Sequence, residues 1–282
     1  MNNILLSFDV EEFDMPLEYG HKISSMEQME VGYRGLDAIA PILHEVPTTL
    51  FTTANFADHF PEKIKSLADT HEIASHTYYH SSYASANLLR SRVRLEEITH
   101  KKIYGLRMPR MKATCAKSVL DAGYAYDASI HPTWLPGRYN NLHLSRLPYI
   151  DQELWRIPVS VTPKWRIPLF WLSFKCFPFS LYKEFALRTL THDGHLSLYF
   201  HPWEFTDLKG SGLPLYTRLI CGDRLVERLI NLINVLSKYG TFTTMASFAK
   251  IDHAVFRLDS LKNNSLQEIT SQVTTQGNAF NA

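Results

Sequence analysis

The 282-residue sequence has only three cysteines, Cys115, Cys176 and Cys221, and they are far apart. An odd number without a CxxC spacing predicts neither a disulfide framework nor a cysteine metal site. No apolar run reaches the roughly 18 residues of a membrane-spanning helix. The N-terminus also lacks the basic and apolar regions of a secretory signal. We therefore expect a cytoplasmic protein with reduced thiols.

The sequence also lacks an excess of charge of either sign. The 29 Lys and Arg residues offset 28 Asp and Glu residues, which leaves a formal net charge of +1. This balance gives no overall attraction to nucleic acid, so we expect no nucleic-acid partner. Hydrophobic residues make up 45% of the chain and charged residues 20%, as is typical of a globular protein.

Short apolar strands alternate with helical patterns along most of the chain. The strand candidates are 4–8, 48–53, 72–75, 104–106, 124–129, 155–161, 196–200 and 241–245, and the helix candidates are 31–46, 61–68, 85–102, 116–122 and 225–239. This alternation favours βα units around a mostly parallel sheet. No linker divides the chain, so we expect one domain over residues 1–260 and a polar tail over 261–282.

Two motifs contain candidate metal ligands. The acidic stretch 9–12 follows the first predicted strand, and Asp9 and Glu11 share a face if the strand continues that far. His76 and His80 follow another short strand at i, i+4 spacing, which places two imidazoles on one side of a helical turn. Taken alone, each motif also fits a simpler interpretation, a polar loop or a chance pair of histidines.

Two further motifs lie at predicted strand ends. Arg107 is followed by Pro109 and Arg110, and an arginine fixed in this way can hold a carboxylate through a bidentate contact. His201 ends an apolar strand, a position that suits a general acid in an α/β barrel. A buried structural histidine would give the same pattern.

The order of these motifs resembles the polysaccharide deacetylases, which are the NodB-homology enzymes of carbohydrate esterase family 4. The acidic stretch, HxxxH, Arg-x-Pro at 107–109, Asp-x-Ser at 127–129 and Leu-x-x-His at 198–201 occur in the family's order. The resemblance implies an α/β fold, a distorted (β/α) barrel of about seven parallel strands that is similar to a TIM barrel. It also implies a metal-dependent hydrolase that removes N-acetyl groups from an amino sugar.

The resemblance assigns a role to each catalytic residue. Asp9 corresponds to the catalytic base and Arg107 to the arginine that orients it. His201 corresponds to the general acid and Asp127 to the acid that pairs with this histidine. The implied substrate is an acetylated amino sugar in a polysaccharide or its precursor.

The implied metal ligands are His76, His80 and one carboxylate. The family commonly has a second aspartate directly after the base, where this chain has Val10. Strand alternation favours Glu11 as the third ligand, whereas a β-bulge would favour Glu12. Two imidazoles and a carboxylate suit Zn²⁺, and Co²⁺, Ni²⁺ or Fe²⁺ fit the same ligands.

The same motifs imply a set of substrate-binding residues, namely Tyr79, Pro109, Arg110, Trp134, Leu198 and Trp203. Leu198 and Trp203 would form the pocket for the acetyl methyl group. The backbone N–H of Tyr79 or of a neighbour would stabilise the oxyanion. Arg110 would add positive charge near the substrate.

One aromatic-rich segment, 165–185, is interrupted by Pro168 and Pro178, which argue against a long regular helix. The favoured interpretation is an excursion packed over the barrel. The alternative is an exposed apolar surface that contacts a partner or a lipid. In the latter case the substrate would be a lipid-linked precursor at the inner face of the membrane.

Two other functions remain open from the sequence. The family includes enzymes that hydrolyse cyclic amides or other C–N bonds on the same scaffold. A non-catalytic glycan-binding domain is the second alternative, although the joint presence of Asp9, His76, His80 and His201 argues against it. The sequence leaves the number of subunits open.

Overall fold

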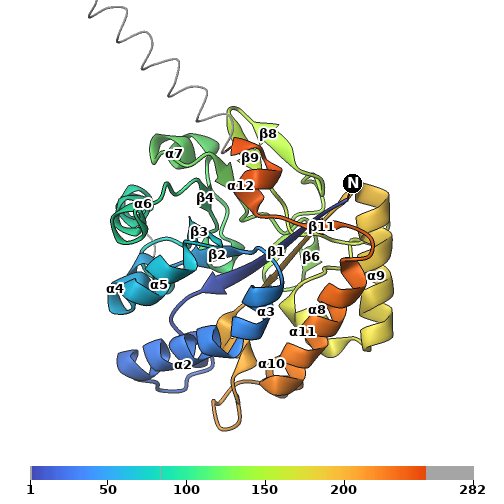
Figure 1. Ribbon diagram of the computed structural model, residues 1–282, viewed down its shortest axis with the longest axis horizontal. Helices are drawn as coiled ribbons and strands as arrows, with labels where there is room; N and C mark the ends of the chain where they lie inside the picture. The colour runs from blue at the N-terminus through green and yellow to red at the C-terminus, as the bar shows by residue number, and fades with distance from the viewer. Residues whose placement is uncertain (1, 83, 252–282) are drawn as a thin grey trace, which may run out of the picture.

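The computed structural model describes residues 2–82 and 84–251. The predicted polar tail over 261–282 lies outside these residues. A curved sheet of parallel strands forms the centre of the molecule (Figure 1), in the order β10-β1-β2-β3-β4-β5-β9. These strands are β1 (Asn3–Val10), β2 (Thr49–Thr52), β3 (Glu72–Ser75), β4 (Gly105–Leu106), β5 (Tyr126–Asp127), β9 (Leu154–Arg156) and β10 (His195–Phe200). The predicted α/β fold with a distorted barrel of about seven parallel strands is confirmed.

The two ends of this strand series approach each other. Ser160, beyond β9, donates its backbone N–H to the carbonyl of Ser197 in β10 at 2.9 Å, and Ser197 donates its N–H to Ser160 Oγ at 2.8 Å. Four short strands lie outside the series: β6 (Trp134–Leu135), β7 (Tyr139–Asn140), β8 (Tyr149–Asp151) and β11 (Thr241–Phe242). Of these, β8 pairs antiparallel with β9, and β11 pairs with the start of β1.

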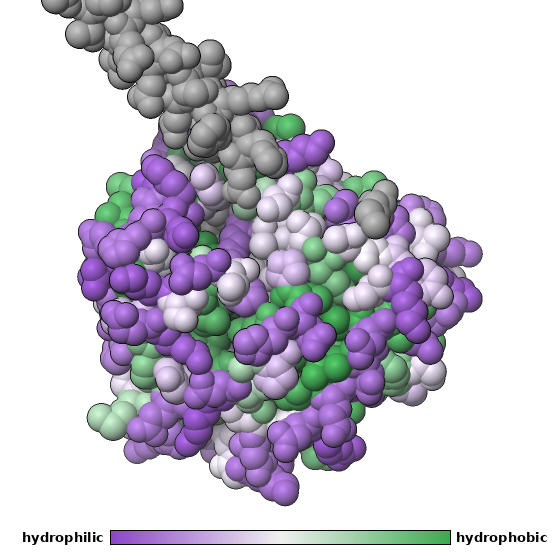
Figure 2. Space-filling view, viewed as in Figure 1, coloured by the Kyte–Doolittle hydropathy of each residue, from purple (hydrophilic) through white to green (hydrophobic). Residues whose placement is uncertain are grey.

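Helices pack around the outside of the sheet (Figure 1). They are α1 (Met15–Glu18), α2 (Ser25–Ala38), α3 (Ala40–Glu45), α4 (Ala54–His59), α5 (Pro61–Leu67), α6 (Ala86–Thr99), α7 (Ala116–Asp121), α8 (Trp171–Cys176), α9 (Phe179–Asp193), α10 (Leu215–Arg218), α11 (Asp223–Leu236) and α12 (Met245–Phe248), with 3-10 turns η1 (Pro109–Met111) and η2 (Pro202–Phe205). In Figure 2, hydrophilic side chains cover most of the outer helices, and hydrophobic ones are visible between them near α3 and α11. Within the described residues, no helix is long and apolar enough to cross a bilayer.

The helix predicted over 31–46 is two helices with an earlier start. The backbone N–H of Glu27 donates to Ser24 Oγ at 3.2 Å, which caps the N-terminus of α2. Pro41 lacks an N–H and cannot continue the hydrogen-bond ladder of α2. The chain therefore bends at Ile39 and begins α3.

The aromatic segment 165–185 also forms two helices, α8 and α9, with the break at Pro178. Phe174 and Tyr182 are fully buried, and their ring centroids lie 4.8 Å apart. Trp165 in contrast is 74% exposed. The segment thus packs over the sheet for most of its length, and α9 is longer and more regular than the sequence predicted.

Two glycines bring α2 directly against the chain that follows β1 and β10. A Cβ on Gly32 would lie 2.6 Å from the carbonyl oxygen of Glu11, and a Cβ on Gly35 would lie 2.4 Å from the carbonyl carbon of Pro202. Both distances are far inside van der Waals contact. The absence of a side chain at these two positions therefore lets α2 support the segments that carry Glu11 and His201.

We predict that Gly35→Ala destabilises the protein. Overpacking costs about 1–3 kcal/mol, whereas the gain in helix propensity is at most about 1 kcal/mol. Met26→Ala is the control, because Met26 lies in the same helix and is 74% exposed. Urea unfolding should show a lower free energy of unfolding for Gly35→Ala and a change within about 0.5 kcal/mol for Met26→Ala. Equal stability of Gly35→Ala and the unmodified protein would contradict this packing.

Candidate active site

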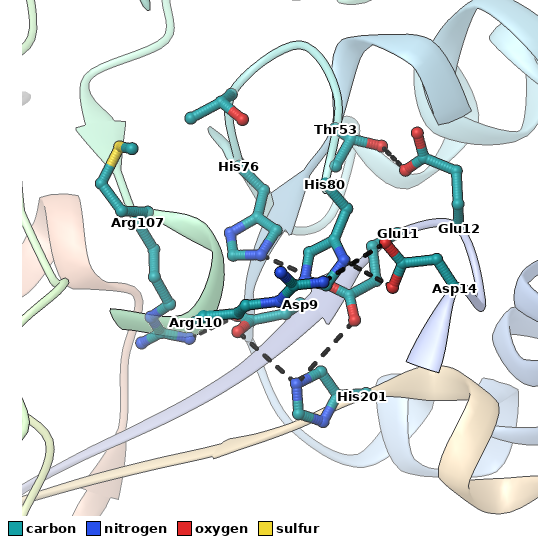
Figure 3. A network of polar contacts seen from close by, with 12 residues as sticks. Asp9, Glu11, Glu12, Asp14, Thr53, His76, His80, Arg107, Arg110 and His201 are labelled. Carbon is teal, nitrogen blue, oxygen red and sulfur yellow. Dashed lines mark hydrogen bonds and ion pairs between the residues drawn. The ribbon is translucent and has the colours of Figure 1, made fainter. Parts of the chain in front are cut away.

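The carboxyl ends of several parallel strands bring the candidate residues together. Asp9 lies near the end of β1, and His76, Arg107 and His201 directly follow β3, β4 and β10. Figure 3 shows Asp9, Glu11 and the three histidines His76, His80 and His201 gathered in one cluster. In α/β barrels this edge of the sheet carries the active site.

Glu11 lies between the two histidines of the HxxxH motif. Its Oε2 atom is 3.1 Å from His76 Nε2 and 3.3 Å from His80 Nε2. One ligand atom from each of the three residues lies within 4.8 Å of the others. The turn is not helical as predicted, because Thr77 has a left-handed φ of 64°. A hydrogen bond from the backbone N–H of Thr77 to Ser75 Oγ, at 3.1 Å, stabilises this strained conformation.

Glu12 points away from this cluster (Figure 3). Its carboxylate accepts hydrogen bonds from Thr53 Oγ1 at 2.7 Å and from Asn55 Nδ2 at 2.6 Å. The geometry therefore favours Glu11 over Glu12 as the carboxylate partner of the two histidines.

The charges in this cluster compensate one another. Burial alone would raise the pKa of Glu11, but the charges of His80 and His201 and a hydrogen bond with His76 hold it well below its usual range. Burial would lower the pKa of His80, but Glu11 and Asp14 together raise it to about 9. The buried site thus has an ionised carboxylate that requires positive charge beside it.

This donor set fits a divalent metal. Two imidazole nitrogens and a carboxylate oxygen are typical zinc ligands. Glu11 Oε2 is buried and faces the Nε2 atoms of His76 and His80, so that the three donor atoms converge on one point. Asp14 Oδ1 lies 2.7 Å from His80 Nδ1, and a carboxylate on the far nitrogen commonly orients a metal-binding histidine.

Asp9 is fixed on one side by a buried arginine. Arg107 donates from one terminal nitrogen to Asp9 Oδ1 at 2.6 Å and to Ser7 Oγ at 3.0 Å. The guanidinium is fully buried and lies 4.0 Å above the ring of Phe51. The other carboxylate oxygen of Asp9 lies 3.9 Å from His201 Nε2. Asp9 therefore has one oxygen held by Arg107 and one near His201.

The carboxylate that pairs with His201 is Glu204, not Asp127. Glu204 Oε1 lies 2.9 Å from His201 Nδ1, and Glu204 Oε2 lies 2.8 Å from Lys175 Nζ. Burial would lower the pKa of His201, but Glu11, Glu204 and Asp9 raise it. Burial would raise the pKa of Glu204, but Lys175 and His201 lower it.

Asp127 belongs to the wall of the barrel. It forms an ion pair with Arg156, its register partner on β9, and accepts a hydrogen bond from the backbone N–H of Ser129 at 3.0 Å. We therefore correct the pairing that the family resemblance implied. The signal for Glu204 was its i+3 position after His201, in a turn that returns its side chain to the histidine.

A cavity of about 260 Å³ opens over these residues. Its lining includes Asp9, Glu11, His76, His80, Arg110, His201 and several aromatic residues, among them Tyr139, Phe170, Trp171, Tyr199 and Trp203. Trp203 stacks on His201 at 4.9 Å between ring centroids and donates from Nε1 to Glu11 Oε1 at 3.2 Å. The rings of Trp171 and His201 are nearly perpendicular, with their centroids 5.4 Å apart. Trp171 could not be predicted from a motif, because it lies in the aromatic segment 165–185.

Several predicted substrate residues lie elsewhere. Leu198 is buried in the outer core with its register partner Leu6, because strand alternation gives the cavity face of β10 to Tyr199 and His201. Trp134 is 60% exposed, and neither Trp134 nor Tyr79 lines this cavity in the described residues. Of the set, Arg110 and Trp203 line it, and Pro109 lines a neighbouring cavity.

Comparison with known proteins agrees with the motifs. Residues 34–126 match the polysaccharide deacetylase family. A solved structure from Mycobacterium smegmatis, assigned to the polysaccharide deacetylases, is 22% identical with a TM-score of 0.61, over 89% of this chain and 90% of that one. PuuE allantoinase is 18% identical with a TM-score of 0.65, over the same shares. Curated proteins give no significant match. The resemblance to the polysaccharide deacetylases is confirmed, and the two structures share the fold.

We predict that Glu11→Gln weakens zinc binding much more than Glu12→Gln. The first change removes a candidate direct ligand, so the loss should exceed the roughly 10- to 100-fold that follows from changing an outer partner. Glu12→Gln is the matched control, because it makes the same side-chain change at the next position, where the carboxylate accepts hydrogen bonds from Thr53 and Asn55 instead. Zinc affinity is measured by titration of the metal-free protein against a chelating dye. Equal losses in the two variants would contradict the assignment of Glu11.

Proposed function

We propose that the protein is a metal-dependent hydrolase that removes N-acetyl groups from an amino sugar in a polysaccharide or its precursor. The observation that carries this proposal is the convergence of Glu11, His76 and His80 with Asp9 and His201 in one cavity. The family match supports hydrolysis of an acetylated glycan as the class of reaction.

In this proposal Glu11, His76 and His80 hold a divalent metal, which we propose is Zn²⁺; Co²⁺, Ni²⁺ and Fe²⁺ fit the same ligands. When bound, the metal supplies a Lewis acid that lowers the pKa of water and polarises the amide carbonyl. Asp14 keeps the His80 ring in position through its contact with Nδ1.

The remaining steps are proton transfers by residues of the chain. Asp9 accepts a proton from the attacking water, because Arg107 occupies Oδ1 and leaves Oδ2 on the side of His201. His201 donates a proton from Nε2 to the leaving nitrogen, since Glu204 faces Nδ1 and favours the protonated ring. Water adds to the acetyl carbon and the C–N bond breaks, which yields acetate and a free amine.

The direct test is acetate release by zinc-loaded protein from N-acetylglucosamine and its oligomers. We expect release that stops after chelation and returns when zinc is added back. Glu11→Gln is the control for contaminating activity. Ring opening of cyclic amides without acetate release would overturn the deacetylase proposal. Glycan binding with no acetate release in the presence of Zn²⁺, Co²⁺, Ni²⁺ or Fe²⁺, each tested in turn, would also overturn it.

We predict that Glu204→Gln reduces kcat by at least about tenfold, within the roughly 10²–10⁴-fold contribution of general acid–base catalysis. Loss of the Glu204 charge removes the partner that favours protonated His201. The loss should be larger for an N-acetyl sugar than for 4-nitrophenyl acetate, whose leaving group departs without a proton. A merely structural role would lower both rates equally.

Asp127→Asn is the matched control for this prediction. It breaks a buried pair with Arg156, so we expect lower thermal stability at a cost of about 3–5 kcal/mol. Activity per folded molecule, with the folded fraction measured by circular dichroism, should stay near that of the unmodified protein. A lost kcat in Asp127→Asn beside a normal kcat in Glu204→Gln would reverse the assignment.

A further inference from the structure

A second cavity of about 480 Å³ adjoins the candidate active site. The two cavities share His80, Arg110, Met111, Arg138 and Tyr139 in their linings. A substrate with its acetamido group beside His80 therefore has direct access to the second cavity.

The lining of the second cavity is cationic. It includes Arg110, Lys112 and Arg138, and among the described residues it contains no carboxylate. One carboxylate outside this lining serves both arginines, because Glu18 lies 2.7 Å from Arg110 Nε and 3.5 Å from a terminal nitrogen of Arg138. A guanidinium has five N–H donors. The pair therefore keeps a net positive charge and donors for a further anion.

The other carboxylate near Arg110 is already engaged. Asp14 Oδ2 lies 3.8 Å from Arg110 (Figure 3), while Asp14 Oδ1 contacts His80 at 2.7 Å. Asp14 is thus committed to orienting His80. It does not neutralise Arg110 in the way that a close bidentate contact would.

The backbone that carries Arg110 is strained. Arg110 and Met111 both have left-handed φ angles, 57° and 53°. This conformation is unfavourable for a residue with a Cβ, and such strain is concentrated at functional sites. Glycine or asparagine would adopt it more easily. The position instead holds an arginine, whose side chain is 42% exposed and lines both cavities.

We propose that the substrate carries an anionic group, a phosphate or a carboxylate, next to its N-acetyl group, and that Arg110 and Arg138 bind this group. The inference rests on the proposed function and narrows its substrate class. Guanidinium groups recognise both anions through paired N–H donors. The anion either displaces Glu18 or binds beside it. A neutral acetylated oligosaccharide offers these cations no counterion.

The test compares three ligands on the zinc-loaded protein by isothermal titration. They are N-acetylglucosamine 1-phosphate, N-acetylmuramic acid and the neutral methyl glycoside of N-acetylglucosamine. At least one anionic ligand should bind about tenfold or more tightly than the neutral one, since a hydrogen bond to a charged group contributes about 1.5–3 kcal/mol. The better of the two anionic ligands identifies phosphate or carboxylate as the natural group.

The metal itself attracts anions, so variants are needed to distinguish anion binding by the arginines from anion binding by the metal. Arg110→Asn removes the charge and tolerates the left-handed backbone, and Arg138→Gln removes the second charge. Each should reduce the ratio of anionic to neutral affinity by about tenfold. Lys117→Gln is the control, because it removes one positive charge from a side chain that is 72% exposed and paired with Asp121. Its ratio should change less than about twofold.

The outcomes distinguish this inference from the proposed function. A preference for anions that survives both arginine substitutions, or no preference in the unmodified protein, would overturn the subsite. Acetate release from neutral sugars at the same kcat/KM as from anionic sugars would also overturn it, while the deacetylase proposal would stand. Anion binding that depends on both arginines without acetate release from any sugar would support the subsite and contradict the deacetylase.

Discussion

The ionised carboxylate of Glu11 is the constraint around which the site is built. It is only 4% exposed, and a buried charge is costly unless opposite charges and hydrogen bonds surround it. His76 and His80 face one of its oxygens, and the indole of Trp203 and the ring of His201 face the other. Because these four partners come from two different regions of the chain, satisfying one carboxylate fixes the relative positions of β1, the HxxxH turn and η2.

The other charged groups of the site are compensated in the same way by oppositely charged partners. Arg107 after β4 faces Asp9 of β1, and Asp14 faces His80. Lys175 of α8 faces Glu204, which in turn faces His201. Apart from the local pair of Glu204 with His201, each of these contacts joins two segments that are distant in sequence. The ionic contacts that would tune the proton chemistry therefore also hold the strand ends in register, so chemistry and local stability are coupled here.

Strand-end residues could be predicted from the sequence because their positions follow from periodicity. Asp9 and His201 come directly from apolar runs, and alternation along β1 also favoured Glu11 over Glu12. The partners of these groups could not be predicted in this way. Asp127 was expected beside His201, but Arg156 on the neighbouring strand neutralises it. The contact of Glu204 with His201 depends on the turn after β10. The burial of Leu198 depends on which face of that strand meets the cavity.

Catalytic and substrate-binding residues differ in the parts of the fold that carry them. The two groups proposed to transfer protons, Asp9 and His201, lie on or directly after strands, where a two-residue period determines direction. Arg110, Arg138 and Trp171 lie in connections, where left-handed backbone and proline-broken helices determine direction and no period exists. The proposed class of reaction could therefore be inferred from a single sequence, because residues at strand ends carry it. The proposed anion subsite becomes visible only when the connections are placed, since two arginines 28 positions apart share one carboxylate, Glu18.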